Sequence, residues 1–213
     1  MKRRAAIGIV FFLSILSLCV GQAMATGPTD VHGNPIHTKG KFGVDVVVGP
    51  SVLLQEPMEG VSGKVAFTAG GSLFYSITDW FLVGVTGEWD MRHFDLDDEG
   101  IDLGKDSNIT VLPFAELRGP FSSYLYFGVG YNFNDLEDLE DVFGSKIDMD
   151  DTLAIQGGGG WDAFVTEHLA INVELGIKYN KGGANLVQGA TSTPLGDINL
   201  TAFVGTVGLR YFF

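Results

Sequence analysis

Basic residues and cysteine are scarce in this sequence, and their scarcity excludes several classes of protein. Only 13 of the 213 residues are Lys or Arg, whereas 26 are Asp or Glu. Nucleic-acid binding requires a basic surface, so we expect no nucleic-acid partner. The single cysteine, Cys19, lies near the start of the chain, so residues 26–213 can form neither a disulfide nor a cysteine metal site.

Long hydrophobic runs are also rare. The run at residues 7–20 is shorter than a transmembrane helix, which needs about 20 apolar residues. Residues 2–4 before it are basic, and Ala-Met-Ala at residues 23–25 fits a signal-peptidase site, which favours a secretory signal peptide over a single-helix anchor. We expect a cleaved signal peptide at residues 1–25, a periplasmic lead at 26–40 and a single domain at 41–213.

Charge and hydropathy disagree in a way that indicates a membrane. Without the expected signal peptide, ten basic and 26 acidic residues remain, a formal charge of −16. The mean hydropathy of the chain is nevertheless +0.22, which is unusual for an acidic soluble domain. A transmembrane β-barrel explains both values, because its lipid-facing residues are apolar while its charges gather in loops.

Apolar and polar residues alternate with a period of two through most of the chain, which is typical of β-strands. The segment from Leu169 to Tyr179 is the clearest, with Ile171, Val173 and Leu175 on one face. The pattern predicts eight strands, at residues 41–54, 64–77, 80–93, 107–118, 123–134, 151–164, 168–180 and 197–213.

The segments between these strands alternate in length. Four are long, at residues 55–63, 94–106, 135–150 and 181–196, and three are tight, at 78–79, 119–122 and 165–167. Long outer loops and short periplasmic turns are typical of bacterial outer-membrane barrels. We therefore predict an all-β, eight-stranded antiparallel transmembrane up-and-down β-barrel in the outer membrane of a Gram-negative bacterium, with both termini periplasmic.

A soluble lipocalin-like barrel is the alternative fold, and its faces would be reversed. The apolar face would then point inward and the other face would meet water. That other face consists largely of Gly, Thr, Asn and Ala, which makes a poor aqueous exterior and a good barrel lumen. Aromatic residues also gather at the strand ends, as interfacial girdles require.

Three segments carry a resemblance to a known family. The last five residues, Leu-Arg-Tyr-Phe-Phe, resemble the terminal signal read by the outer-membrane assembly machinery, with Tyr211 and Phe213 on the lipid face. The segments 124–134 and 154–179 resemble strands five to seven of the OmpW-like family. This resemblance implies a conduit or binding pocket for small hydrophobic solutes, which leave sideways through the barrel wall.

Catalytic and metal-binding patterns are weak. His93 and Ser107 lie near the expected outer rim, but they lack the spacing of the lipid-modifying barrel enzymes, so we expect no enzyme and no cofactor. Acidic residues between Asp95 and Asp106 match part of a calcium loop, but position 12 is Asp rather than Glu and no helices flank the segment. A solvated acidic surface is favoured there over a dedicated calcium site. A looser role, in which these carboxylates share Mg²⁺ or Ca²⁺ with lipopolysaccharide phosphates, is the alternative.

The lumen-facing residues suggest how the barrel is filled. By alternation, five charged residues of the periplasmic half point inward and are expected to form a salt-bridged plug: Asp45, Glu116, Arg118, Asp162 and Arg210. Four residues nearer the outside are expected to form an apolar lining: Leu112, Leu200, Ala202 and Val204. Pro113 and the glycine run 157–160 are two candidate weak points in the wall.

Two functions fit this pattern. The barrel is a conduit or pocket for small hydrophobic solutes, or it is a structural barrel with a filled lumen and acidic loops that meet surface partners. Either function makes outer-membrane lipid, lipopolysaccharide and the assembly machinery its expected partners.

Overall fold

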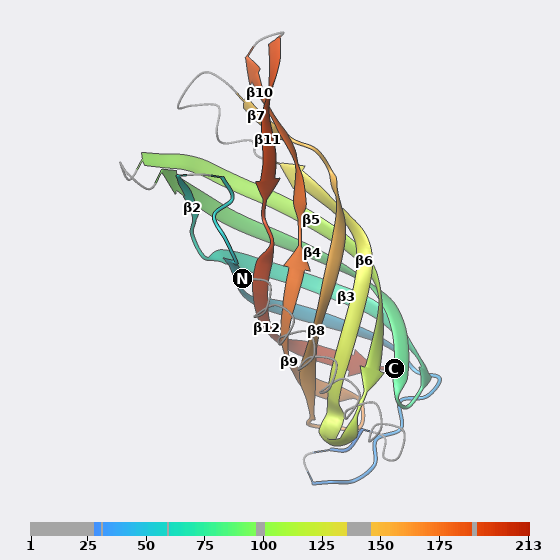
Figure 1. Cartoon of the computed structure of the whole chain (residues 1–213). Helices are drawn as coiled ribbons and strands as arrows, with labels where there is room; N and C mark the ends of the chain where they lie inside the picture. Colours follow the sequence, from blue (N-terminus) through green and yellow to red (C-terminus); the bar gives the residue numbers. More distant parts are fainter. Residues whose placement is uncertain (1–27, 31, 59, 97–100, 136–145, 189–190) are drawn as a thin grey trace, which may run out of the picture.

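The computed structural model describes residues 28–30, 32–58, 60–96, 101–135, 146–188 and 191–213, so the expected signal peptide lies outside the described residues. Eight strands form the barrel (Figure 1): β1 (Phe42–Leu53), β3 (Ala66–Thr78), β4 (Phe81–Leu96), β5 (Ile101–Arg118), β6 (Ser123–Asp135), β8 (Thr152–Phe164), β9 (Leu169–Tyr179) and β12 (Ala202–Phe212). Within the described ranges, no helix has the length and apolarity needed to cross a membrane.

Each barrel strand pairs antiparallel with the next one along the chain, and β12 pairs with β1 to close the barrel. Gly43 at the start of β1 lies opposite Phe212 at the end of β12. Both ends of the barrel sequence therefore lie at the end that carries the three tight turns, called the turn end below. The opposite end, which carries the long connections, is called the loop end. The predicted eight-stranded antiparallel barrel is confirmed.

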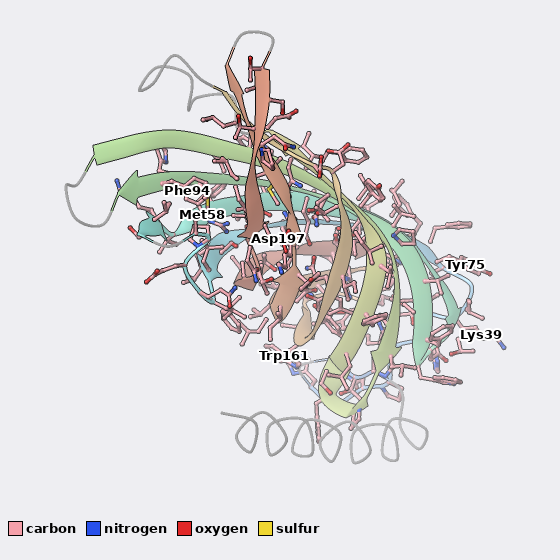
Figure 2. The ribbon with its side chains drawn as sticks, turned by 45° about the horizontal axis from the view of Figure 1, so that its top comes forward. Lys39, Met58, Tyr75, Phe94, Trp161 and Asp197 are labelled. Atoms are coloured by element: carbon pink, nitrogen blue, oxygen red, sulfur yellow. The ribbon has the colours of Figure 1, made fainter. Side chains whose placement is uncertain are left out.

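The exterior of the barrel is apolar. Side chains such as Leu73, Val85, Leu175 and Val207 are exposed along the strands, and Tyr75 projects outward in Figure 2. Because successive residues of a strand point to opposite faces, the intervening polar residues are buried in the lumen. An exterior of this kind is stable in lipid and not in water, which excludes the soluble lipocalin-like alternative.

Two expected loops are mostly β-structure. β4 and β5 continue far beyond the 9–11 residues that cross a membrane, and they leave only residues 97–100 between them. The segment expected as loop 181–196 forms β10 (Lys181–Gln188) and β11 (Thr191–Asn199). β10 pairs with β11 on one side and with β7 (Lys146–Met149) on the other, in a separate three-stranded sheet that rises above the barrel (Figure 1).

The last barrel strand begins at Ala202 rather than at the expected residue 197, because residues up to Asn199 belong to β11. A short strand, β2 (Val61–Gly63), pairs with the outer part of β4. Beyond the membrane no lipid contacts the strands, so neither face has to be apolar. Polar strands can therefore pair there without the alternation of apolar and polar residues that identified the membrane-spanning strands.

Candidate functional site

The lumen is the candidate functional site, and its lining is densely charged. Strand alternation turns ten charged side chains inward, and all are buried or half-buried: Asp45, Glu88, Asp90, Arg92, Glu116, Arg118, Asp162, Glu174, Lys178 and Arg210. Charges removed from water are tolerated only when they are paired and hydrogen-bonded. The pairs that they form determine what the lumen can admit.

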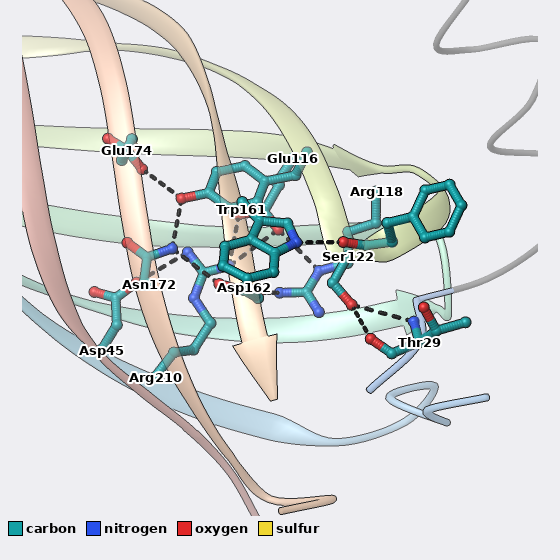
Figure 3. Close-up of polar contacts among 12 residues, drawn as sticks. Thr29, Asp45, Glu116, Arg118, Ser122, Trp161, Asp162, Asn172, Glu174 and Arg210 are labelled. Atoms are coloured by element: carbon teal, nitrogen blue, oxygen red, sulfur yellow. Dashed lines mark hydrogen bonds and ion pairs between the residues drawn. The ribbon is translucent and has the colours of Figure 1, made fainter. Parts of the chain in front are cut away.

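Five of these residues form one cluster near the turn end, called the turn-end ion network: Asp45, Glu116, Arg118, Asp162 and Arg210 (Figure 3). Arg118 lies 2.8 Å from both Glu116 and Asp162. Arg210 lies 3.1 Å from Glu116, 3.0 Å from Asp162 and 3.2 Å from Asp45. The structure therefore brings together all five residues that the sequence placed in the expected plug.

Neutral residues complete the turn-end ion network. Asn172 donates hydrogen bonds to Asp162 at 2.9 Å and to the Tyr124 hydroxyl at 2.6 Å. The Arg210 guanidinium lies over the Tyr124 ring, 4.9 Å from its centroid. Glycines make space for the lumen tyrosines, since a Cβ at Gly160 would stand 2.4 Å from the Tyr124 ring. The glycine run 157–160 therefore relieves crowding inside the barrel.

An apolar layer, called the turn-end floor, lies beneath the network: Phe74, Leu82, Phe164, Ala170, Phe212 and Ile36. Arg118 lies 4.9 Å from the Phe212 ring centroid, and Arg210 lies 5.3 Å from that of Phe74. Cation–π contacts thus connect the charged layer to the apolar layer. Ile36 belongs to the N-terminal lead, so a segment outside the barrel strands helps to close the turn end.

The lead is attached to the turn end by backbone hydrogen bonds. The N–H groups of Thr38 and Lys39 donate to the Asp79 carboxylate at 2.7 and 2.8 Å. Thr29 and Ser122 bond reciprocally, because the Thr29 N–H donates to the Ser122 hydroxyl and that hydroxyl donates to the Thr29 carbonyl. Partial burial raises the pKa of Asp79, but the N–H groups of Lys39 and Thr38 outweigh it and hold the pKa below 3.8.

A second ionic group occupies the half of the lumen nearer the loop end. The Lys178 ammonium lies 3.1 Å from Glu88 and 2.5 Å from Asp90. Gln156 donates to Glu88 at 3.0 Å, and Thr68 donates to Asp90. Alternation along β4 and β9 turns these three charges inward, but no local pattern predicts which of them pair, because β9 and β4 lie on different parts of the barrel wall.

Asparagine and threonine side chains form a further belt in this half of the lumen, called the polar belt: Asn108, Thr110, Asn132, Asn134, Thr152 and Asn180. Asn132 accepts a hydrogen bond from Thr110 at 2.7 Å and donates one to Thr152 at 3.2 Å. Thr152 donates to Asn180 at 2.6 Å. The belt was not predicted from the sequence, although Asn and Thr recur there at inward-facing positions.

The four residues expected as an apolar lining are all buried, but they do not share one pocket. Leu112 lines a cavity at the centre of the lumen, Leu200 and Ala202 line a smaller one nearer the loop end, and Val204 lines neither. Lys178 is the β9 partner directly opposite Ala202, so its ammonium occupies the space that the lining was expected to leave apolar. Of the two cavities, one is therefore lined by Leu112 and the other by Leu200 and Ala202, and the shared apolar pocket remains an expectation.

Both cavities are small. The volume open to the centre of a water molecule is about 30 Å³ in the central cavity and about 10 Å³ in the other. A cavity needs roughly 10–15 Å³ on this measure to hold one water. These two cavities have room for only a few water-sized species, as expected for an eight-stranded barrel filled by side chains.

The loop end carries a second apolar group, called the loop-end cluster: Phe94, Met149, Ala184, Ile198 and Leu200, with Leu53, Met58 and Val61 packed against it. Its members come from the barrel wall, from β2 and from the three-stranded sheet. The sheet that was expected to be a loop thus buries an apolar face over the barrel mouth. A solute arriving from outside would meet this cluster before the charged lumen.

The remaining sequence-predicted residues lie on the wall. Tyr211 and Phe213 are exposed on the exterior, and their rings are in edge contact at 5.2 Å. Ser107 accepts a hydrogen bond from Trp89 at 2.8 Å, and His93 is half-buried on the neighbouring strand. The side chains of the calcium-like segment 95–106 lie outside the described residues.

Solved structures with the same fold support the architecture. OprG from Pseudomonas aeruginosa aligns with a TM-score of 0.61 and 20% identity, over 83% of this chain and 97% of OprG. AlkL, whose structure was determined in DMPC bilayers, aligns with a TM-score of 0.57 and 13% identity, over 83% of this chain and 92% of AlkL. OmpW of E. coli aligns with a TM-score of 0.51 and 17% identity, over 84% of this chain and 100% of OmpW.

Comparison by sequence found neither a matching family profile nor a matching curated protein. At the identities of OprG, AlkL and OmpW, the likeness establishes the fold alone. The closed barrel and its apolar exterior make this chain an outer-membrane β-barrel protein with the OmpW-like fold that the resemblance predicted.

Proposed function

We propose that this barrel takes up small hydrophobic solutes at the loop end and releases them sideways into the membrane between β5 and β6. The observation that carries the proposal is a gap in the hydrogen-bonded ladder at Pro113. β5 and β6 pair up to Val111 opposite Tyr131 and resume at Phe114 opposite Gly128. Proline has no N–H to donate, so the wall lacks a hydrogen bond at this point.

The lumen beside this gap is its least polar part. Leu112, Phe114 and Gly128 line the central cavity next to the gap, and Glu116 is the one carboxylate that β5 or β6 contributes to its lining. No side chain of Gly128 or Gly130 covers this part of β6, and a Cβ at Gly130 would stand 2.0 Å from the Val111 carbonyl oxygen. The glycine run 157–160, by contrast, is fully paired with β6 and β9 and contains no gap.

The closed turn end favours a sideways route over a straight one. A solute that passed the loop-end cluster would meet the polar belt and the Lys178 group, and beyond the central cavity it would meet the turn-end ion network and the turn-end floor. Moving an apolar molecule through paired charges is unfavourable, whereas moving it past Leu112 into lipid is favourable. The small cavity requires side chains to move as the solute passes.

Replacement of Pro113 tests the route. Pro113→Ala restores an N–H, so we expect it to complete the ladder and to slow uptake of a hydrophobic fluorescent probe into intact cells. Pro50→Ala is the matched control, because Pro50 also interrupts a ladder, between β1 and β12, which lie on the opposite side of the barrel from β5 and β6. Equal uptake by wild type and a well-folded Pro113→Ala variant would refute the sideways route.

A structural barrel is the second candidate function, and the two ionic groups that fill the lumen favour it. In this case the acidic loop-end residues, such as Asp148, Asp150 and Asp151, would face lipopolysaccharide and share divalent cations with its phosphates. Uptake by a deletion strain distinguishes the two functions. A rate equal to that of the parent strain would leave the structural role as the better account.

A further inference from the structure

Negative charge exceeds positive charge in the lumen, and the central cavity within it is lined by Asp45, Glu88, Glu116 and Glu174 against Arg210. In the described part of the lumen, six acidic side chains face four basic ones, which are Arg92, Arg118, Lys178 and Arg210. Glu174 accounts for part of the excess, because its carboxylate accepts a hydrogen bond from the Tyr124 hydroxyl at 3.1 Å and makes no ion pair with any described residue. An uncompensated charge in such a narrow space is strongly unfavourable.

Two oxygen atoms beside Glu174 also lack a partner. Asp45 Oδ1 and Gln156 Oε1 are buried and accept no hydrogen bond, although their side chains are only 5% and 3% exposed. Asp45, Gln156 and Glu174 all line the central cavity, from three different strands. A buried acceptor without a donor is costly, so these oxygens indicate a positively charged or proton-donating occupant.

Size and geometry restrict the occupant. The 30 Å³ cavity accommodates two or three water-sized species, and Na⁺ and K⁺ are no larger than water. No group of three or more His, Cys, Asp and Glu side chains is arranged to hold a metal ion in the described ranges, which argues against a divalent cation held by several carboxylates. Neutral and singly charged oxygens with a few waters suit a monovalent ion.

We infer that the central cavity binds one small monovalent cation, Na⁺ or K⁺, through oxygens of Asp45, Gln156 and Glu174. The ion neutralises part of the excess charge and gives both unpartnered oxygens a ligand. It lies between the turn-end ion network and the Lys178 group, in a cavity whose lining includes four carboxylates and one protein cation, Arg210. This site is independent of solute uptake and is expected whether or not the wall opens at Pro113.

Thermal unfolding of the refolded barrel in detergent tests the site. We expect the unfolding midpoint to be higher in NaCl or KCl than in N-methyl-D-glucammonium chloride at the same ionic strength, with a dependence on cation concentration that saturates. Glu174→Gln should abolish this dependence. Glu56→Gln, in an exposed loop segment, is the matched control and should retain it. Equal midpoints for wild type in all three salts would refute the site, as would an unchanged dependence in Glu174→Gln.

A diffraction measurement on the wild-type protein keeps the inference testable if Glu174→Gln does not fold. Crystals grown in Rb⁺ or Tl⁺ should show an anomalous peak in the central cavity, within coordination distance of Asp45 and Gln156. Water density without an anomalous peak would overturn the inference. An infrared band of a protonated carboxyl group that disappears in Glu174→Gln would also overturn it, because a proton would then balance the charge.

Discussion

Replacement of Arg210 by Met should destabilise the barrel more than any other single change in the turn-end ion network. Arg210 pairs with three carboxylates, and Asp45 has no other ion pair among the described residues. Met fills a similar volume but leaves Asp45 uncompensated, while Glu116 and Asp162 keep only Arg118. Removing one partner from a buried ion pair costs about 3–5 kcal/mol, so we expect a loss of that size in the free energy of unfolding.

Urea unfolding in detergent, followed by tryptophan fluorescence and by the heat-dependent shift in gel mobility, measures this loss. The urea dependence should keep its slope, because the surface exposed on unfolding is unchanged. Lys181→Met is the matched control, since Lys181 pairs with Asp197 at 2.8 Å on the exposed sheet, where solvent screens the pair and its loss should hardly change stability.

A second substitution separates charge from packing. Asp45→Asn in the Arg210→Met background removes the uncompensated carboxylate and should recover part of the lost stability, whereas a pure packing defect would not respond. If Arg210→Met were no more destabilised than Lys181→Met, the turn-end ion network would not hold the barrel closed, and the reasoning from buried charge would fail.

Three further predictions concern the ends of the barrel. Asp79→Asn should release the N-terminal lead and make it sensitive to protease, whereas Asp30→Asn, whose bonds are made within the lead to His32 and Asn34, should not. The pKa of Asp79 is lowered in the folded protein, so the stabilising contribution of this carboxylate is complete at neutral pH. It is lost only as the pH falls through that lowered pKa, below 3.8. Proteolysis of the wild-type lead, measured as a function of pH, would show the transition. Deletion of Phe213 should slow assembly and leave more heat-unmodified protein in pulse-chase samples, and a normal rate would mean that the terminal aromatic is not a recognition element. Asp197→Cys should react with a membrane-impermeant thiol reagent on intact cells while Glu167→Cys should not, and the reverse pattern would invert the proposed topology.

The sequence alone determined the barrel wall. Lipid on one side and a packed lumen on the other impose a period of two on each crossing strand, and that period can be read locally. It identified eight strands with boundaries close to the observed ones, except for β5 and β12, which begin six residues earlier and five residues later than expected. It also identified which charges face inward, because facing depends only on position along a strand.

Tertiary structure alone decided which inward residues meet. Lys178 pairs with Glu88 and Asp90 across the lumen because of strand tilt and register, which no local pattern contains. The same register places this lysine opposite Ala202, in the part of the lumen where hydropathy suggested an apolar pocket. Two further features could not be predicted from the sequence for a related reason: the three-stranded sheet over the barrel mouth and the insertion of Ile36 into the turn-end floor. Both form where neither lipid nor a regular lumen imposes a period, so only contacts between distant segments specify them.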